Sequence, residues 1–220
     1  MKKIFLSLIV LAFLVFDLQH TIASYCSDDD NYRGQVQIRE KGKPVKNAKI
    51  KIKGITYPDF VEKLKADEYG IFFLCSADYE DGDYMITAKK SGYEESRYLL
   101  SMNYDYGIPD PKLENSFTMD MDKIGQAPNN KGEISGRILN DYYEEYIINL
   151  LIEGTSKTNY SKHQELNIEE TGFNFKNLKP DVYTLTFTRI SGSYYIKVID
   201  LKKNMKCSIY VYLDDFEDFE

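Results

Sequence analysis

The sequence predicts an all-β protein whose short strands pack as sandwiches. Between residues 181 and 190, Tyr183, Leu185 and Phe187 alternate with threonines, and this period of two is typical of half-buried strands. Turn residues recur about every 8 to 12 positions, which is the spacing expected of a sandwich. No window of adequate length shows a helical period, so helices are not expected to form the core.

The chain opens with the pattern of a secretory signal peptide. Met-Lys-Lys precedes an apolar run at residues 4–16, and polar residues then lead to Ala23 and Ser24. This run is shorter than the roughly 20 apolar residues that span a bilayer. We therefore expect a signal peptide over residues 1–23 and a secreted or periplasmic mature chain without a transmembrane anchor.

The first predicted domain covers residues 32–124. A turn at Gly42 and Pro44 leads into a strand with Ala48, Ile50 and Ile52 on one face. Three lysines lie on the other face, at positions 49, 51 and 53. Such a lysine row indicates a solvated sheet face or a guarded edge, with a charged binding surface as the alternative.

A linker and a second copy follow. Residues 125–131 combine Gly, Pro and Asn without apolar anchors, a composition typical of domain boundaries. The same order of turns and strands then restarts over residues 132–214, with residues 146–152 as a central strand, and a frayed acidic tail occupies residues 215–220. The recurrence indicates an internal repeat of about 90 to 100 residues.

Turn glycines and core alternation link both copies to a known family. In the first copy the pattern comprises Gly34, Val36, Gly42, Pro44, Val45, Asn47, Ala48, Ile50, Ile52, Asp67, Gly70, Phe72, Gly82, Tyr84, Lys90, Gly92 and Tyr93. In the second it comprises Gly136, Ile138, Thr171, Gly172, Phe173, Phe175, Asn177, Leu178, Pro180, Tyr183 and Leu185. The pattern resembles the carboxypeptidase regulatory-like domain family. The resemblance implies two tandem immunoglobulin-like/prealbumin-like (transthyretin-like) β-sandwich domains that serve as accessory modules without catalysis.

Three cysteines enter an exported, disulfide-permissive space. An odd count allows one disulfide and a free thiol, or three buried thiols. Cys26 with Cys75 is the pair we consider, and Cys207 fits a small buried residue. Asn159 begins an Asn-Tyr-Ser triplet, which is a glycosylation acceptor in a eukaryotic source.

Catalytic chemistry has little support in the sequence. Only His163 remains once the signal is removed, whereas a catalytic zinc site needs several His or carboxylate ligands. We interpret His163 as a loop histidine and expect no enzyme activity and no cofactor. Asp78, Asp81 and Asp83 form a weak calcium candidate, because their oxygens are spaced but no loop signature surrounds them.

Tyrosines are the strongest binding signal, since the chain has 19 Tyr, 12 Phe and no Trp. Several fall in or beside loops, where Tyr provides contact area at low entropy; they are Tyr104, Tyr106, Tyr142, Tyr143, Tyr194 and Tyr195. The net charge of −7 disfavours nucleic acid as a partner. We expect a non-catalytic accessory protein that binds a protein at the cell envelope or surface; the alternative is a carbohydrate-binding accessory.

Overall fold

The computed structural model describes residues 31–38, 41–75, 78–102, 116–125, 131–139, 147–154, 159–167 and 171–217. The predicted signal peptide and most of the predicted linker lie outside these residues. Within the described ranges the chain is all-β, apart from a short 3-10 helix at Leu213–Asp215. None of their helices is long and apolar enough to cross a membrane.

The N-terminal half has two layers. One layer contains β1 (Asn31–Ile38), β2 (Lys43–Pro44), β5 (Ile71–Cys75) and β8 (Ser116–Met121). In it, β1 pairs antiparallel with β5 and β2, and parallel with β8. The other layer has the order β7-β6-β3-β4, with β3 (Lys49–Gly54), β4 (Val61–Lys65), β6 (Gly82–Lys89) and β7 (Ser96–Met102).

The C-terminal half repeats this arrangement. One layer contains β9 (Gly132–Leu139), β12 (Gly172–Leu178) and β15 (Met205–Tyr212). In it, β9 pairs antiparallel with β12 and parallel with β15. The other has the order β14-β13-β10-β11, with β10 (Ile147–Gly154), β11 (Ser161–Asn167), β13 (Asp181–Arg189) and β14 (Tyr194–Leu201). The central position expected for the strand at 146–152 is confirmed for residues 147–152, which lie between β11 and β13, and residue 146 lies outside the described residues.

A tyrosine at the same place in each half anchors this correspondence. Tyr84 of β6 donates its hydroxyl hydrogen to the carbonyl of Glu80, four residues earlier, at 2.7 Å. Tyr183 of β13 donates to the carbonyl of Lys179, also four residues earlier, at 2.9 Å. Both rings are almost fully buried. The same type of hydrogen bond, from a tyrosine side chain to the backbone four residues earlier, therefore forms at the start of β6 and at the start of β13.

Each half has its own hydrophobic core between its two layers. The alternation read in the sequence determines which residues enter it, because successive side chains of a strand point to opposite faces. On β3, Ile50 and Ile52 are buried while the lysines between them are exposed. On β13, Tyr183, Leu185 and Phe187 are buried and the intervening threonines are partly exposed.

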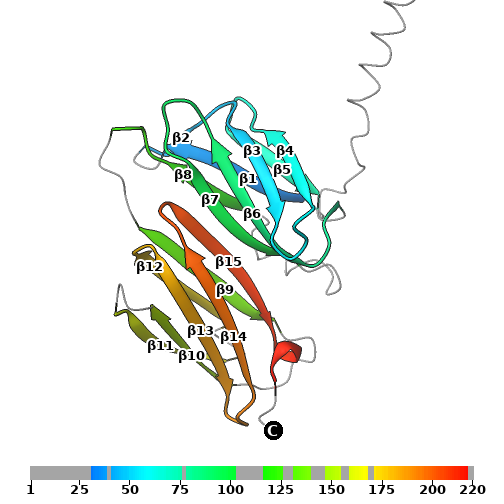
Figure 1. The fold of residues 1–220 in the computed structure, drawn as a ribbon, viewed down its shortest axis with the longest axis vertical. Helices are drawn as coiled ribbons and strands as arrows, with labels where there is room; N and C mark the ends of the chain where they lie inside the picture. Colours follow the sequence, from blue (N-terminus) through cyan, green and yellow to red (C-terminus); the bar gives the residue numbers. More distant parts are fainter. Residues whose placement is uncertain are drawn as a thin grey trace, which may run out of the picture.

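One sheet joins the two halves. The strand order β12-β9-β15-β7-β6-β3-β4 forms a seven-stranded sheet, in which β15 pairs parallel with β7 (Figure 1). On β7, Leu100 enters the N-terminal core, whereas Leu99 enters the C-terminal core. A single strand thus contributes to both cores, and the halves are joined by backbone hydrogen bonds as well as by side-chain packing.

The end of the chain is more ordered than a frayed tail. Asp215 belongs to the 3-10 helix, and Glu217 pairs antiparallel with Tyr194. Phe216 packs against the C-terminal core. Residues 218–220 lie outside the described residues.

Candidate interaction surface

Tyr194 and Tyr195 begin β14 and point to opposite faces of its sheet. Tyr195 lies on the core side, with its ring centroid 6.0 Å from that of Phe187 and 6.2 Å from that of Phe216. Desolvation by burial raises the pKa of Tyr195. Tyr194 is partly exposed. The two rings do not form the coplanar platform that stacks on a sugar. Tyr104, Tyr106, Tyr142 and Tyr143 lie outside the described residues.

A shallow pocket of about 470 Å³ opens beside these tyrosines. It is lined by Tyr194, Tyr195, Ile196, Asp215 and Glu217. Two carboxylates next to aromatic and aliphatic side chains suit a basic or amphipathic side chain of a protein. The pocket exists because the end of the chain docks at Tyr194, which sequence reasoning did not anticipate.

Asp83, part of the calcium candidate, connects the two halves. Its carboxylate accepts a hydrogen bond from the Ser101 hydroxyl at 2.6 Å. It also forms an ion pair with the Lys197 ammonium, at 2.6 Å. Asp78 and Asp81 have interaction partners of their own. Within the described part of the chain, no three His, Cys, Asp or Glu residues gather so that they could hold a metal ion. The geometry gives Asp83 a structural role.

The remaining reactive side chains are dispersed. His163 is exposed on β11, opposite Leu151, and not in a loop as expected. Cys75 is disulfide-bonded; Cys26 lies outside the described residues, so its pairing with Cys75 stays a prediction. Cys207 is a buried free thiol whose pKa is raised by burial. Asn159 is exposed just before β11, and its glycosylation stays a prediction.

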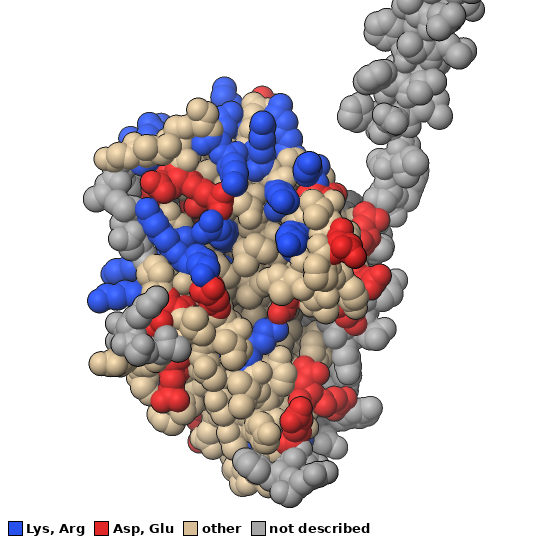
Figure 2. Space-filling model, in the orientation of Figure 1, with Lys and Arg blue, Asp and Glu red and all other residues tan. Residues whose placement is uncertain are grey.

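Lysines gather on the outer face of β3 and β4. Lys49 lies opposite both Lys65 and Lys89, and Lys51 lies opposite Lys63. Like charges directly opposite each other are destabilising, although lysines on an edge strand also prevent unwanted strand pairing. Figure 2 shows Lys and Arg gathered on the upper part of the molecule, where Figure 1 places these strands. The protein therefore has a basic face although its net charge is acidic. In the linear sequence the lysines of this face appear only as separate groups.

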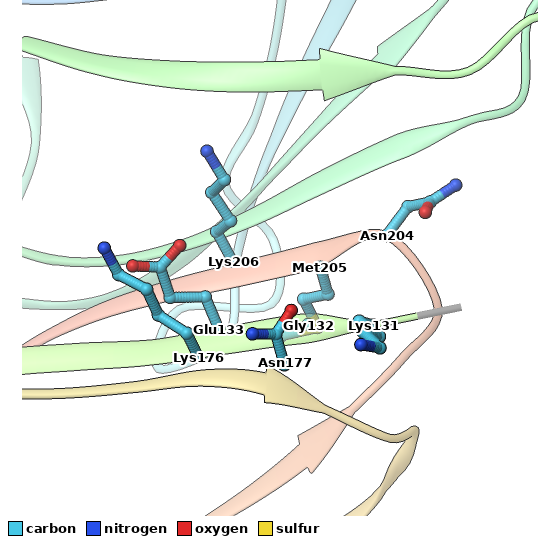
Figure 3. A pocket seen from close by; sticks show the side chains of 8 residues that line it. All are labelled: Lys131, Gly132, Glu133, Lys176, Asn177, Asn204, Met205 and Lys206. Carbon is cyan, nitrogen blue, oxygen red and sulfur yellow. The ribbon is translucent and has the colours of Figure 1, made fainter. Parts of the chain in front are cut away.

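A second small pocket, of about 130 Å³, lies near the start of β9 and β15. It is lined by Lys131, Gly132, Glu133, Lys176, Asn177, Asn204, Met205 and Lys206 (Figure 3). Its lysines do not converge, because Lys131 lies apart from Lys176 and Lys206. Lys206 pairs with Asp120 at 2.9 Å, and Lys176 lies beside the Glu133 carboxylate. This arrangement does not form an anion-binding site.

The outer face of β13 and β14 has a different character, and we call it the β14 face. Its residues are Val182, Thr184, Thr186, Thr188, Tyr194, Ile196, Val198 and Asp200. Ile196 is 50% exposed and Val198 is 61% exposed. Figure 2 shows few charged side chains over these strands, in the lower part of the molecule. A flat face of threonines and exposed aliphatic residues is typical of protein contact.

The β14 face also borders a backbone edge, because β14 ends its sheet among the described strands. The N–H of Tyr194 donates to the Glu217 carbonyl at 2.9 Å, and the Tyr194 carbonyl accepts from the Glu217 N–H at 2.8 Å. Backbone groups alternate along a strand, so those of Ile196 and Val198 point to the same edge. The exposed apolar side chains therefore accompany an edge that can accept another strand.

Comparisons with known proteins identify no family. No family model and no curated protein match the chain. Among solved structures, the Bacillus anthracis TIE protein aligns with 16% identity and a TM-score of 0.32, over 83% of this chain and 33% of that one. The shaft pilin SpaA from Lactobacillus rhamnosus GG aligns with 10% identity and a TM-score of 0.31, over 83% and 97%.

A third structure is an enzyme, the 3-chlorocatechol 1,2-dioxygenase from Rhodococcus opacus 1CP. It aligns with 17% identity and a TM-score of 0.31, over 45% of this chain and 63% of that one. The chain thus spans about a third of the TIE protein and less than two thirds of the dioxygenase. All three TM-scores lie well below 0.5, so these structures carry no argument about this protein. Its class, an all-β protein of the sandwich type, follows from its own strand pairing.

Proposed function

We propose that this chain is a non-catalytic, extracytoplasmic interaction protein that binds a protein partner through its β14 face. Its two prealbumin-like domains, residues 32–124 and 132–214 with a linker at 125–131, act as one body. The exposure of Ile196 and Val198 beside a strand edge that no other described strand pairs carries the proposal. A protein partner can bury such aliphatic side chains and add a strand to the edge beside them.

The type of side chain favours protein over carbohydrate as the partner. The one tyrosine pair of the β14 region points to opposite faces of its sheet, so it offers no stacking surface for a sugar ring. The flat, weakly charged β14 face suits the buried centre of a protein interface, where charged residues are depleted.

Export agrees with the covalent chemistry. Cys75 is disulfide-bonded, and disulfides persist in oxidising compartments. Together with the apolar segment at residues 4–16, this supports a secreted or periplasmic location for the mature chain.

The proposal is tested by cross-linking capture from the native extracytoplasmic fraction, with residues 24–220 as bait. Wild-type chain is compared with the double variant Ile196→Lys/Val198→Lys and with the control Val61→Lys, which changes another exposed valine, 46% exposed, in the N-terminal half. We expect a protein that wild type and control retain and the double variant loses. Equal retention by all three, in chains shown to be folded, would place the interaction elsewhere.

A further inference from the structure

We propose that the basic face of the N-terminal half binds a linear acidic polysaccharide. This face is formed by Lys49, Lys51 and Lys53 of β3 together with Lys63 and Lys65 of β4, and all five side chains are exposed. Figure 2 shows their region as the part of the viewed surface where blue side chains gather. It is a different surface from the β14 face, so it adds a second binding site to the proposed function.

The strand register arranges the five lysines in two neighbouring rows. Lys49 lies opposite Lys65, and Lys51 lies opposite Lys63, while Lys53 continues the row of β3. Lysines within a row are about 6.6 Å apart, and the two strands are about 4.8 Å apart. Both spacings are shorter than the Debye length of about 8 Å at physiological ionic strength. The positive potentials of the five ammonium groups therefore add along one elongated strip.

The carboxylates around this strip are engaged elsewhere. Lys89, which lies opposite Lys49 on β6, pairs with Glu95 at 2.6 Å. Glu62 of β4 is on the core side of the strand, where it accepts a hydrogen bond from the Tyr79 hydroxyl. The ion pairs among the described residues use other cations than the five of the basic face. The charges of the basic face are therefore available to an external anion.

Protection of a sheet edge explains only some of these lysines. Strand β4 ends its sheet, so Lys63 and Lys65 discourage the addition of another strand. Strand β3 lies between β4 and β6, and its three lysines border no edge. Like charges directly opposite each other destabilise a sheet. A row of lysines that costs stability on an interior strand indicates a role in binding.

The composition of the face favours a polysaccharide over other anions. Protein interfaces are depleted in Lys and enriched in aromatic residues and Arg, and bases stack on aromatic or Arg side chains. The two rows contain neither type. An anionic bilayer is bound best where apolar residues accompany the cations. Tyr57, the exposed aromatic residue that follows β3, instead interacts with the Glu80 carboxylate, and that end repels an anionic bilayer.

A linear acidic polysaccharide matches the properties that remain. Its carboxylate or sulfate groups recur along a chain, as the lysines recur along the strands. The ammonium group of Lys is a compact charge on a flexible stem, so neighbouring lysines can adjust to the spacing of the anionic groups. Polymers of this kind occur outside cells, in agreement with the proposed export of the chain.

Titration of labelled heparin, a linear sulfated polysaccharide, with residues 24–220 tests the proposal. The variant Lys51→Gln/Lys63→Gln removes two charges from the middle of the strip. The matched control Lys176→Gln/Lys179→Gln removes two charges from exposed lysines of the C-terminal half. We expect the first variant to bind about tenfold more weakly at about 150 mM salt, with a shallower salt dependence, because fewer counterions are released. Equal losses in both variants would show that net charge alone acts, and absence of wild-type binding would refute the site.

The same titration with duplex DNA and with phosphatidylglycerol vesicles, at equal concentrations of negative charge, tests the class of partner. Heparin should bind most tightly. Tighter binding of DNA or of the vesicles would assign the basic face to that partner and overturn the proposal.

Thermal unfolding separates binding from folding. Lys51→Gln/Lys63→Gln should be at least as stable as the wild type, because it relieves repulsion between opposite lysines. A clearly lower transition temperature would mean that these lysines serve the fold, and would contradict the proposal.

Capture of the protein partner gives an independent readout. Lys51→Gln/Lys63→Gln should still retain the protein that depends on Ile196 and Val198. A chain that fails to bind heparin but retains this protein refutes the glycan site and leaves the proposed function intact.

Discussion

At the scale of single residues, close backbone approach requires glycine at position 136 on β9. A Cβ added there would lie 2.4 Å from the Phe173 ring and 2.3 Å from the Ile209 carbonyl oxygen. Both neighbours are held by the strands on either side of β9. The glycine therefore sets the distance between the ring and the sheet.

We expect Gly136→Ala to lower the free energy of unfolding by about 1–3 kcal/mol, because the methyl group overpacks a rigid site. Urea denaturation measures the change. Gly172→Ala on the paired strand is the control, since a Cβ there meets only the Gly136 carbonyl oxygen at 3.9 Å. Equal effects of the two substitutions would show that the site relaxes freely.

Cys207 gives a second prediction at this scale. Burial raises the pKa of its thiol above the ordinary value, so the thiol stays neutral at pH 8 and should not react with an alkylating reagent until the chain unfolds. A raised folded-state pKa contributes stability that is complete below the unfolded pKa and is lost as the pH rises toward the folded value. Mass spectrometry after alkylation, with and without urea, measures the difference; rapid labelling of the folded chain at pH 8 would contradict it.

At the scale of elements, β7 has an unusual position because its two faces serve different cores. Alternation along the strand places Leu100 in one core and Leu99 in the other. The adjacent leucines are visible in the sequence, but the sequence could not assign a partner to Leu99. That partner comes from the C-terminal half, far along the chain.

The ion pair between Asp83 and Lys197 should hold this joint together. Its side chains are 18% and 23% exposed, so removal of one leaves the other poorly solvated. A double-mutant cycle with Asp83→Ala and Lys197→Met should give a coupling of about 2 kcal/mol. The exposed pair Lys202 and Asp200 is the control and should couple by less than about 1 kcal/mol. Couplings of equal size would mean that the joint is solvated.

At the scale of the whole molecule, the seven-stranded sheet makes the two halves one mechanical unit. Backbone pairing between β15 and β7 acts together with the ion pairs Asp83 to Lys197 and Asp120 to Lys206. A tandem repeat joined only by a linker would let its halves move and unfold separately.

We expect the halves to unfold in one transition. Hydrogen exchange read by mass spectrometry should give peptides of β3 and β13 the same free energy of opening in the wild type. Leu99→Lys, which places a charge in the joint, should separate the two values, with β13 becoming less protected. Leu100→Ala, which truncates the N-terminal core, is the control and should lower protection in β3 first. Unequal protection in the wild type would show that the sheet does not couple the halves.

The sequence by itself determined the class of fold and most strand positions, because a period of two and its turn residues are local properties of the chain. It also determined the expectation of export, through the apolar segment at residues 4–16. The role of Asp83 was missed, since the spacing of Asp78, Asp81 and Asp83 suggested calcium and the ion pair to Lys197 joins residues 114 positions apart. Only the tertiary structure decided which strand edges are paired, which carry lysines and which have no partner among the described strands. Strand pairing brings together segments whose relation leaves no local pattern in the sequence.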